Sequence, residues 1–248
     1  MRPLLLCLGL LLATPALAFD IANMTDEERA ILREEIRAYL IENPEVLMDA
    51  ASALEARQSA AMAKADEELV AANAGELFND DWSFVGGNPE GGLTVVEFID
   101  YRCGYCRKSH PEVRELVRSD GDIRYVIKEF PILGEQSLLA SRFALSVLRN
   151  EGPDAYAKVN AGFYDGSFRG EIAETTLKAW AGDLGLDAGK VMAGMADPEV
   201  QRIIDDNHRL AQKLQIGGTP TFVVGGAMIR GYVPLEQMRA IAADERKG

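Results

Sequence analysis

The sequence predicts an α/β domain preceded by an α-helical N-terminal region. Three observations support this fold class. Residues 20–78 are rich in Ala and Glu and contain no strand-like run, whereas strand-like and helical patterns alternate from Asn79 onward. The run Leu93 to Asp100 is apolar nearly throughout, as expected for a strand in a sheet that is covered on both faces. A long block of helical patterns separates this run from the last two strand-like segments.

Residues 1–18 have the pattern of a secretory signal peptide. Arg2 supplies a basic n-region, Leu4 to Leu12 an apolar h-region and Ala16-Leu17-Ala18 a small-residue cleavage site, so Phe19 is expected to begin the mature chain. The apolar run is shorter than the roughly 18–20 residues that a membrane span needs. We therefore expect export to the periplasm of a Gram-negative envelope, with Cys7 removed together with the signal peptide.

Charge and cysteine content restrict the partners and the source of stability. The sequence has 26 Lys and Arg against 39 Asp and Glu, a formal net charge of −13, which argues against nucleic acid as a partner. Once Cys7 is removed, the two remaining cysteines stand in one C-x-x-C, so no framework of structural disulfides is available. A hydrophobic core is therefore expected to hold the fold.

Two helices are predicted in the N-terminal region, residues 19–78. Thr25-Asp26-Glu27-Glu28 has the pattern of a capping box that opens the first helix. Asn43 and Pro44 restart the chain as N-cap and first helical residue, and the second helix is expected to run to about Ala74. The two predicted helices carry few large apolar residues, and the surface that they could bury against each other is too small to hold them together. We expect this region to self-associate or to pack on the following domain, the alternative being a solvated linker.

Residues 79–248 are predicted to form one α/β domain. Gly and Pro residues divide its helical block at 136–214 into several helices. Gly225-Gly226 has the pattern of a hairpin turn between two short strands. In chain order, the expected elements are a strand over 93–100, a helix from the C-x-x-C to about Val117, a strand over 122–130, the helices of 136–214, strands over 221–224 and 227–230, and a helix from about Leu235 to Asp244.

The motif Cys103-Gly104-Tyr105-Cys106 follows the first predicted strand and opens a helix. The first turn of a helix has unpaired backbone N–H groups and the positive end of the helix dipole, which favour an anion. The pKa of Cys103 is therefore expected to fall into the range of roughly 3.5–7.5 that is known for such motifs. Cys103 is the candidate nucleophile, Cys106 the residue that resolves the mixed disulfide, and Cys103–Cys106 the expected redox disulfide.

A C-x-x-C can also be half of a zinc site. No second C-x-x-C exists, and His110 and His208 are the only histidines in the sequence, which disfavours zinc. Cys103, Cys106 and His110 together can form a three-ligand soft site for copper(I), so weak copper binding is an open alternative. We expect no resident metal and no cofactor, and we interpret His110 as a helix residue ahead of Pro111, which would kink the helix.

A second marker is Gly217-Gly218-Thr219-Pro220, which precedes an apolar strand. Proline cannot donate a ladder hydrogen bond, so at this position it indicates a strand start or a cis turn. Together with the C-x-x-C, this pattern resembles the thioredoxin superfamily. The resemblance implies a thioredoxin fold in which Pro220 is the cis-proline that faces the dithiol and Thr219 is the variable residue before it. With Gly104 and Tyr105, these residues are expected to contact the substrate.

The long separation in sequence between Cys103 and Pro220 indicates which family of the thioredoxin superfamily the chain resembles. The helical block between them resembles the inserted helical subdomain of DsbA, and the stretch Val96 to Cys103 resembles the approach to DsbA's active site. In DsbA an acidic residue six positions before the nucleophile lies buried beneath the dithiol, and Glu97 occupies that position here.

A carboxyl in apolar surroundings has a raised pKa, so Glu97 can relay a proton to the second cysteine. Lys128, in the neighbouring strand, is expected to be its partner. The alternatives are a purely structural acid at Glu97 and a solvated lysine.

Residues 20–78 resemble the N-terminal region of the ScsC-like, copper-tolerance-associated relatives of DsbA, notably at Ile41 to Met48. Some of those relatives are trimeric through this region, so the resemblance implies a homotrimer. The dipeptide Gly104-Tyr105 departs from the Pro-His of DsbA, and tyrosine cannot offer an imidazole to the thiolate. Gly-Tyr resembles instead the dipeptide of the disulfide isomerase DsbC.

Three functions therefore compete. The first is a disulfide isomerase or reductase of exported proteins with cysteines, which needs an oligomer and a membrane partner that keeps the dithiol reduced. The second is a monomeric oxidase that a membrane partner re-oxidises. The third is a copper-sequestering envelope protein. The Gly-Tyr dipeptide and the N-terminal helices favour the first function over the second, and the lack of Met/His clusters disfavours the third.

Overall fold

A computed structural model of the chain describes residues 21–247. The expected signal peptide lies outside the described residues. The chain divides into two compact units, the first ending at Gln58 and the second beginning at Ser59. Within residues 21–247, no helix is long and apolar enough to cross a membrane.

The first unit consists of a 3-10 turn at Ile21–Asn23, helix α1 (Asp26–Glu42) and the first part of helix α2 (Glu45–Ala72). The predicted capping box is present, because Glu28 N donates to Thr25 Oγ1 at 3.2 Å and Thr25 N donates to the Glu28 carboxylate at 2.8 Å. The expected role of Asn43 differs. Its side chain donates to Tyr39 O at 2.9 Å, so Asn43 caps the end of α1, and α2 begins at Glu45.

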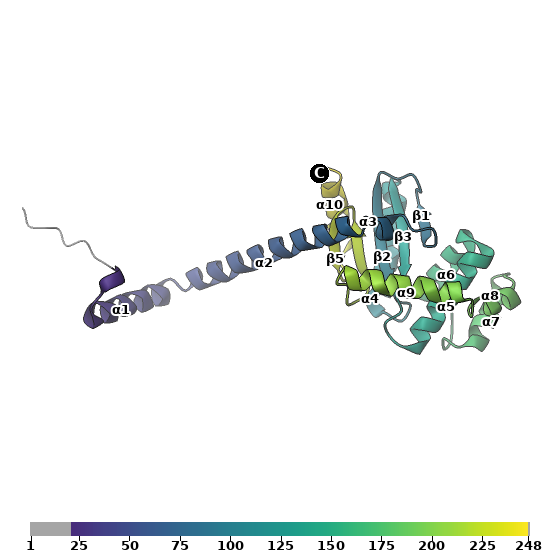
Figure 1. Ribbon diagram of the computed structural model, residues 1–248, viewed down its shortest axis with the longest axis horizontal. Coiled ribbons are helices and arrows are strands. Elements are labelled where there is room, and N and C mark those ends of the chain that lie inside the picture. The colour runs from purple at the N-terminus through teal and green to yellow at the C-terminus, as the bar shows by residue number, and fades with distance from the viewer. Residues whose placement is uncertain (1–20, 248) are drawn as a thin grey trace, which may run out of the picture. The chain divides into compact units, whose positions relative to one another are not determined.

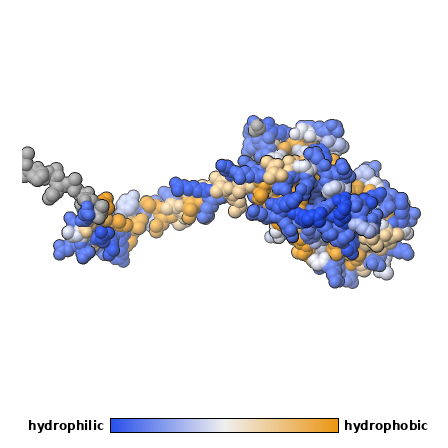
Figure 2. Space-filling model, viewed as in Figure 1, coloured by the Kyte–Doolittle hydropathy of each residue, from blue (hydrophilic) through white to orange (hydrophobic). Residues whose placement is uncertain are grey.

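The described residues of the first unit do not cover its apolar side. No residue of α1 is buried. Figure 2 shows apolar surface along these helices. The exposed large apolar side chains of this unit, each at least half exposed, are Ile21, Ile31, Ile36, Tyr39, Ile41, Leu47, Met48 and Leu54.

A five-stranded mixed sheet forms the centre of the second unit (Figure 1). The strands lie in the order β1-β3-β2-β4-β5, with β2 and β3 parallel and all other pairs antiparallel. Four of them match the predicted strands. Edge strand β1 was not predicted, because its four residues include two glycines and gain strand geometry by pairing with β3. The bounds are β1 Phe84–Gly87, β2 Leu93–Ile99, β3 Ile123–Glu129, β4 Thr221–Val224 and β5 Ala227–Arg230.

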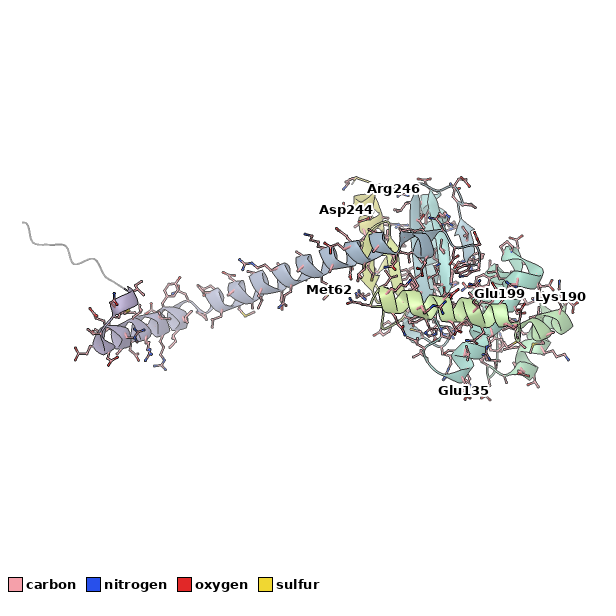
Figure 3. The ribbon with its side chains drawn as sticks, viewed as in Figure 1. Met62, Glu135, Lys190, Glu199, Asp244 and Arg246 are labelled. Atoms are coloured by element: carbon pink, nitrogen blue, oxygen red, sulfur yellow. The ribbon has the colours of Figure 1, made fainter. Side chains whose placement is uncertain are left out.

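Helices cover both faces of the sheet. Helices α4 (Gly104–Asp120) and α10 (Leu235–Glu245) pack on one face, where Arg246 after α10 pairs with Asp120 of α4 at 2.6 Å (Figure 3). Helices α3 (Ala74–Phe78) and α9 (Pro198–Lys213) pack on the other face. The predicted helical insertion is present between β3 and β4. It comprises α5 Glu135–Glu151, α6 Pro153–Asp165, α7 Glu174–Asp183, α8 Ala188–Gly194 and α9.

The second unit begins before Asn79, where the composition of the sequence changes. Val70 near the end of α2 and Leu77 of α3 are buried in one cluster with Val96 and Phe98 of β2. Asp66 of α2 pairs with Arg230 of β5 at 2.6 Å. The sequence does not indicate this boundary, because residues 59–78 remain rich in Ala and Glu and only a few of their apolar side chains attach the segment to the sheet.

Candidate active site

Cys103 is the N-cap residue of α4, as its place after β2 predicted. Its Sγ accepts a hydrogen bond from Cys106 N at 3.4 Å. On the other side, Cys103 Sγ lies 3.1 Å from Thr219 O, to which the thiol donates. Both cysteines are free thiols with little exposure, 7% for Cys103 and 1% for Cys106. Cys103 is therefore the more accessible of the two, although both are buried.

The two thiols differ strongly in acidity. A hydrogen bond from the Cys106 side chain lowers the pKa of Cys103 to about 5, and partial burial opposes this shift. The Thr219 side chain and the backbone N–H groups of Cys106 and Tyr105 lower the pKa of Cys103 further. Burial raises the pKa of Cys106, and its hydrogen bond to Cys103 and the charge of Glu97 raise it further. At neutral pH the pair is thus a thiolate at Cys103 beside a protonated thiol at Cys106.

The loop before β4 completes the surroundings of Cys103. The Thr219–Pro220 peptide bond is cis, as the resemblance implied. Tyr105 is 63% exposed, and its ring lies 6.4 Å from that of Tyr232 in a stacked arrangement. A side chain on Gly104 would meet no atom within 4 Å. The dipeptide between the two cysteines is therefore at the surface, while the cysteines themselves are buried.

Glu97 lies in the middle of β2, on the sheet face that α4 covers, and it is 2% exposed. Burial raises the pKa of Glu97 to about 8; a hydrogen bond from Tyr125 opposes the shift, and the charge of Cys103 adds to it. The Tyr125 hydroxyl donates this hydrogen bond to Glu97 Oε2 from the neighbouring strand β3. Glu97 is the residue whose charge raises the pKa of the Cys106 thiol, so the two groups are electrostatic neighbours.

The expected pairing of Lys128 with Glu97 is wrong. In the parallel register Glu97 stands opposite Ile127, whereas Lys128 stands opposite Phe98. Side chains alternate along a strand, so Lys128 points to the other face of the sheet. There its ammonium group pairs with Asp80 and donates to Glu76 O at 2.9 Å. The residue that contacts Glu97 is Tyr125, three positions before Lys128 in β3. Sequence reasoning missed it, although the alternation of side chains along β3 indicates that Tyr125 and Lys128 point to opposite faces of the sheet.

Sequence reasoning also missed two buried acids that fix the active-site loop. The Asp100 carboxylate accepts hydrogen bonds from Arg102 N at 2.8 Å and from the backbone N–H groups of Ile132 and Leu133 at 2.8 and 3.0 Å. Asp100 therefore holds the segment before Cys103 against the loop that follows β3.

Glu129, at the end of β3, is the second of these acids. It accepts hydrogen bonds from Tyr101, Tyr156 and Ser141 at 2.6–2.7 Å. Burial raises the pKa of Glu129 to about 7, against the effect of these three donors. Because Ser141 and Tyr156 belong to α5 and α6, Glu129 joins the active-site loop to the helical insertion.

The three-ligand copper site is not assembled. Across the described residues 21–247, no three side chains of His, Cys, Asp or Glu gather in a way that could hold a metal ion. The His110 ring lies 4.9 Å from the ring of Tyr164, and burial lowers the pKa of His110 to about 4. Since the helix turns His110 toward α6, it does not join the two cysteines.

Two family models match the chain. The DSBA-like thioredoxin domain matches residues 94–242, and the Copper resistance protein ScsC N-terminal domain matches residues 28–61. The chain belongs to the DsbA-like thioredoxin family. The second match confirms the expected resemblance of the N-terminal region to the ScsC-like group.

Solved structures of family relatives agree with this assignment. A thioredoxin-like oxidoreductase from Silicibacter pomeroyi DSS-3 is 40% identical with a TM-score of 0.65, over 71% of this chain and 99% of that one. Salmonella enterica Typhimurium BcfH is 28% identical with a TM-score of 0.71, over 90% of this chain and 97% of that one.

Among curated relatives, the thiol:disulfide interchange protein DsbA of Bordetella pertussis is 29% identical over 140 residues, which is 55% of this chain and 65% of that protein. The chain spans about a quarter of the length of the first curated relatives that it matches. One of these is the Na(+)/H(+) antiporter NhaA 1 of Salinispora arenicola, 29% identical over 165 residues and 24% of its length.

Proposed function

We propose that this chain is a periplasmic thiol–disulfide oxidoreductase that acts on protein disulfides through Cys103 and Cys106, in the direction of isomerisation or reduction. The observation that supports it most is the opposite acidity of the two thiols. The thiolate is the nucleophile in disulfide exchange, so Cys103 attacks a substrate while Cys106 stays protonated.

The reaction starts when Cys103 Sγ bonds to one sulfur of a substrate disulfide and the other substrate sulfur leaves as a thiolate. In isomerisation, a second substrate thiolate attacks the substrate sulfur of this mixed disulfide, and Cys103 leaves as a thiolate with no net change of oxidation state. In reduction, Cys106 attacks Cys103 Sγ and the substrate leaves with two thiols. The Cys103–Cys106 disulfide then needs two electrons from a membrane reductase.

Glu97 can accept the proton that Cys106 must lose before it attacks. While Cys103 is a thiolate, its charge helps to raise the pKa of Glu97 and keeps the carboxyl largely protonated. Forming the mixed disulfide removes that charge, so the pKa of Glu97 falls and more carboxylate becomes available. More of the proton acceptor is therefore in its deprotonated form at the step that needs it.

The residues around the dithiol and in the first unit favour isomerisation or reduction over oxidation. Tyr105 offers no imidazole to the Cys103 thiolate and points into solvent, where it can contact a substrate together with Thr219 and Pro220. The uncovered apolar side of α1 and α2 suits association with further copies of the chain, which we propose to be a homotrimer. Several dithiols in one assembly give a multivalent surface for misfolded substrates and hinder access by a membrane oxidase.

The test combines two measurements on residues 19–248: mass by light scattering and refolding of scrambled ribonuclease. Residues 59–248 are the comparison, because this cut keeps Asp66 and Val70 in place, whereas a deletion of 19–74 would remove them from the sheet. We expect a trimer with isomerase activity for the longer chain. For the shorter chain we expect a monomer that keeps dithiol exchange and loses isomerase activity.

A matched pair of substitutions tests the same point in the whole chain. Ile36→Lys places a charge on the apolar side of α1 and should lower the measured mass, whereas Glu34→Gln makes the same change of net charge and should not. A monomeric wild type with full oxidase activity would establish the alternative, a monomeric oxidase that a membrane partner re-oxidises.

A further inference from the structure

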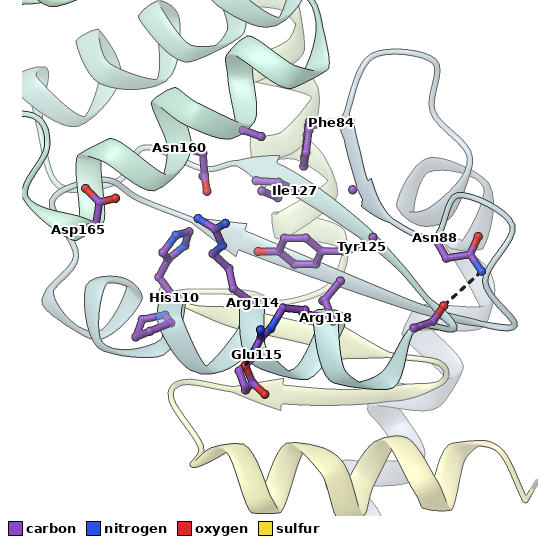
Figure 4. A pocket seen from close by; sticks show the side chains of 16 residues that line it. Phe84, Asn88, His110, Arg114, Glu115, Arg118, Tyr125, Ile127, Asn160 and Asp165 are labelled. Carbon is purple, nitrogen blue, oxygen red and sulfur yellow. Dashed lines mark hydrogen bonds and ion pairs between the residues drawn. The ribbon is translucent and has the colours of Figure 1, made fainter. Parts of the chain in front are cut away.

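A cavity of about 740 Å³ lies beside α4 (Figure 4). Its walls come from α4, from β1 and β3, and from α6 of the helical insertion. Phe84, Val117, Tyr125 and Ile127 supply an apolar lining. Its volume is within the range of about 300–1,000 Å³ that is typical of small-molecule sites.

One polar side chain in this cavity lacks a partner. His110 is 8% exposed, and its buried Nε2 atom makes no hydrogen bond within the described chain. Burial lowers the pKa of His110 to about 4, so at pH 7 the ring is neutral and has one N–H donor and one acceptor nitrogen. A buried nitrogen without a partner is costly, and a bound ligand atom would remove that cost.

A charged donor lies next to His110. Figure 4 shows the Arg114 guanidinium between His110 and Asn160. Arg114 forms no ion pair with any residue in the described part of the chain, whereas Arg118, one turn further along α4, pairs with Glu115. A guanidinium matches the geometry of an oxyanion and binds it in a bidentate manner.

The acids at the cavity limit the charge of its ligand. Asp165 accepts a hydrogen bond from Ser167 N at 2.8 Å and forms no ion pair with Arg114, although hydrogen bonds from Ser167 and, to a smaller extent, the charge of Arg114 lower the pKa of Asp165. Glu115 is already paired with Arg118. Both carboxylates would repel a dianion such as phosphate more than a monoanion. One unpaired guanidinium, one neutral imidazole and an apolar wall therefore match a single carboxylate with a hydrocarbon part.

We propose that this cavity binds a small organic carboxylate with an aromatic or branched hydrocarbon group. The carboxylate bonds to Arg114 and to the donor nitrogen of His110, and the hydrocarbon lies against Phe84, Tyr125 and Ile127. The site is separate from the dithiol, and the binding does not depend on the proposed direction of disulfide exchange.

Isothermal titration calorimetry of residues 19–248 with 3-phenylpropionate tests this proposal. We expect saturable binding, and binding of 3-phenylpropan-1-ol and of acetate should be weaker, because the first lacks the charge and the second the hydrocarbon. Arg114→Gln should weaken the binding of 3-phenylpropionate by about ten-fold or more, as expected for the loss of a charge-assisted hydrogen bond. Arg114 is exposed, so this substitution should preserve the fold.

Arg209→Gln is the matched control, because it removes the same charge from α9 on the opposite face of the sheet and should leave the affinity unchanged. Three results would overturn the proposal: no heat of binding with the wild type, equal affinity for the acid and the alcohol, or equal loss of affinity in both arginine variants.

Discussion

Replacing Glu97 by glutamine should stabilise the fold, and the gain should depend on pH in a defined way. Burial raises the pKa of Glu97 from 4.5 to about 8. Between these two values the unfolded chain loses the proton and the folded chain keeps it, so the free energy of unfolding falls as pH rises. The stability contributed by protonated Glu97 is complete below about pH 4.5 and is lost as pH rises through 8.

The size of the effect follows from the shift in pKa. Each pH unit within this window costs about 1.4 kcal/mol, so the folded wild type loses about 3 kcal/mol at pH 7 and about 5 kcal/mol above pH 8. Glutamine does not titrate and can still accept the hydrogen bond from Tyr125. Glu97→Gln should therefore match the wild type near pH 4.5, exceed it by about 3 kcal/mol at pH 7 and by no more than about 5 kcal/mol at pH 8.5.

Equilibrium unfolding in urea measures the difference in free energy of unfolding between Glu97→Gln and the wild type at the three pH values. The measurement is made with reductant present and is followed by the fluorescence of Trp82 and Trp180. Glu90→Gln is the control, because Glu90 is exposed and its replacement should not change the pH dependence. The same Glu97→Gln variant should resolve mixed disulfides about ten-fold or more slowly, because the proton acceptor is lost. The reasoning would be refuted if the free energies of unfolding of Glu97→Gln and the wild type differed by the same amount at all three pH values and the variant turned over at the wild-type rate. Glu97 would then be a structural acid.

Three further predictions concern the same region. Thiolate absorbance of the reduced protein should titrate with a midpoint near pH 5, and a midpoint near 8.5 would contradict this. Because the pKa of Cys103 is lowered, the contribution of Cys103 to the stability of the reduced fold should be complete above about pH 9 and should be lost as pH falls through 5. Tyr125→Phe removes a hydrogen bond that lowers the pKa of Glu97, so the pH–rate profile of disulfide exchange should move to higher pH. Lys128→Met should cost about 3–5 kcal/mol in urea unfolding, because the buried Asp80 carboxylate loses its counter-ion and keeps its hydrogen bonds from Ser83. Lys128→Met combined with Asp80→Asn should recover much of this loss, and dithiol exchange should be unchanged in both variants.

The sequence by itself determined the elements that local patterns specify. The apolar run of β2, the breaks at Gly and Pro in the helical block and the capping box at Thr25 each depend on neighbouring residues, and the structure confirms all three. The position of Cys103 at a helix start and of Pro220 before β4 depends equally on local order. These patterns were sufficient for the fold class and for the dithiol.

Only the tertiary structure decided which side chains meet. Lys128 and Tyr125 both lie in the strand next to Glu97. The register of β2 and β3 and the alternation of side chains place Tyr125 in contact with Glu97, whereas Lys128 lies on the other face of the sheet and pairs with Asp80. The attachment of Val70 to the sheet, the hydrogen bonds of Glu129 to the helical insertion and the cavity at Arg114 join segments that are distant in the chain. Such contacts depend on packing between elements, and no periodicity within one segment encodes them.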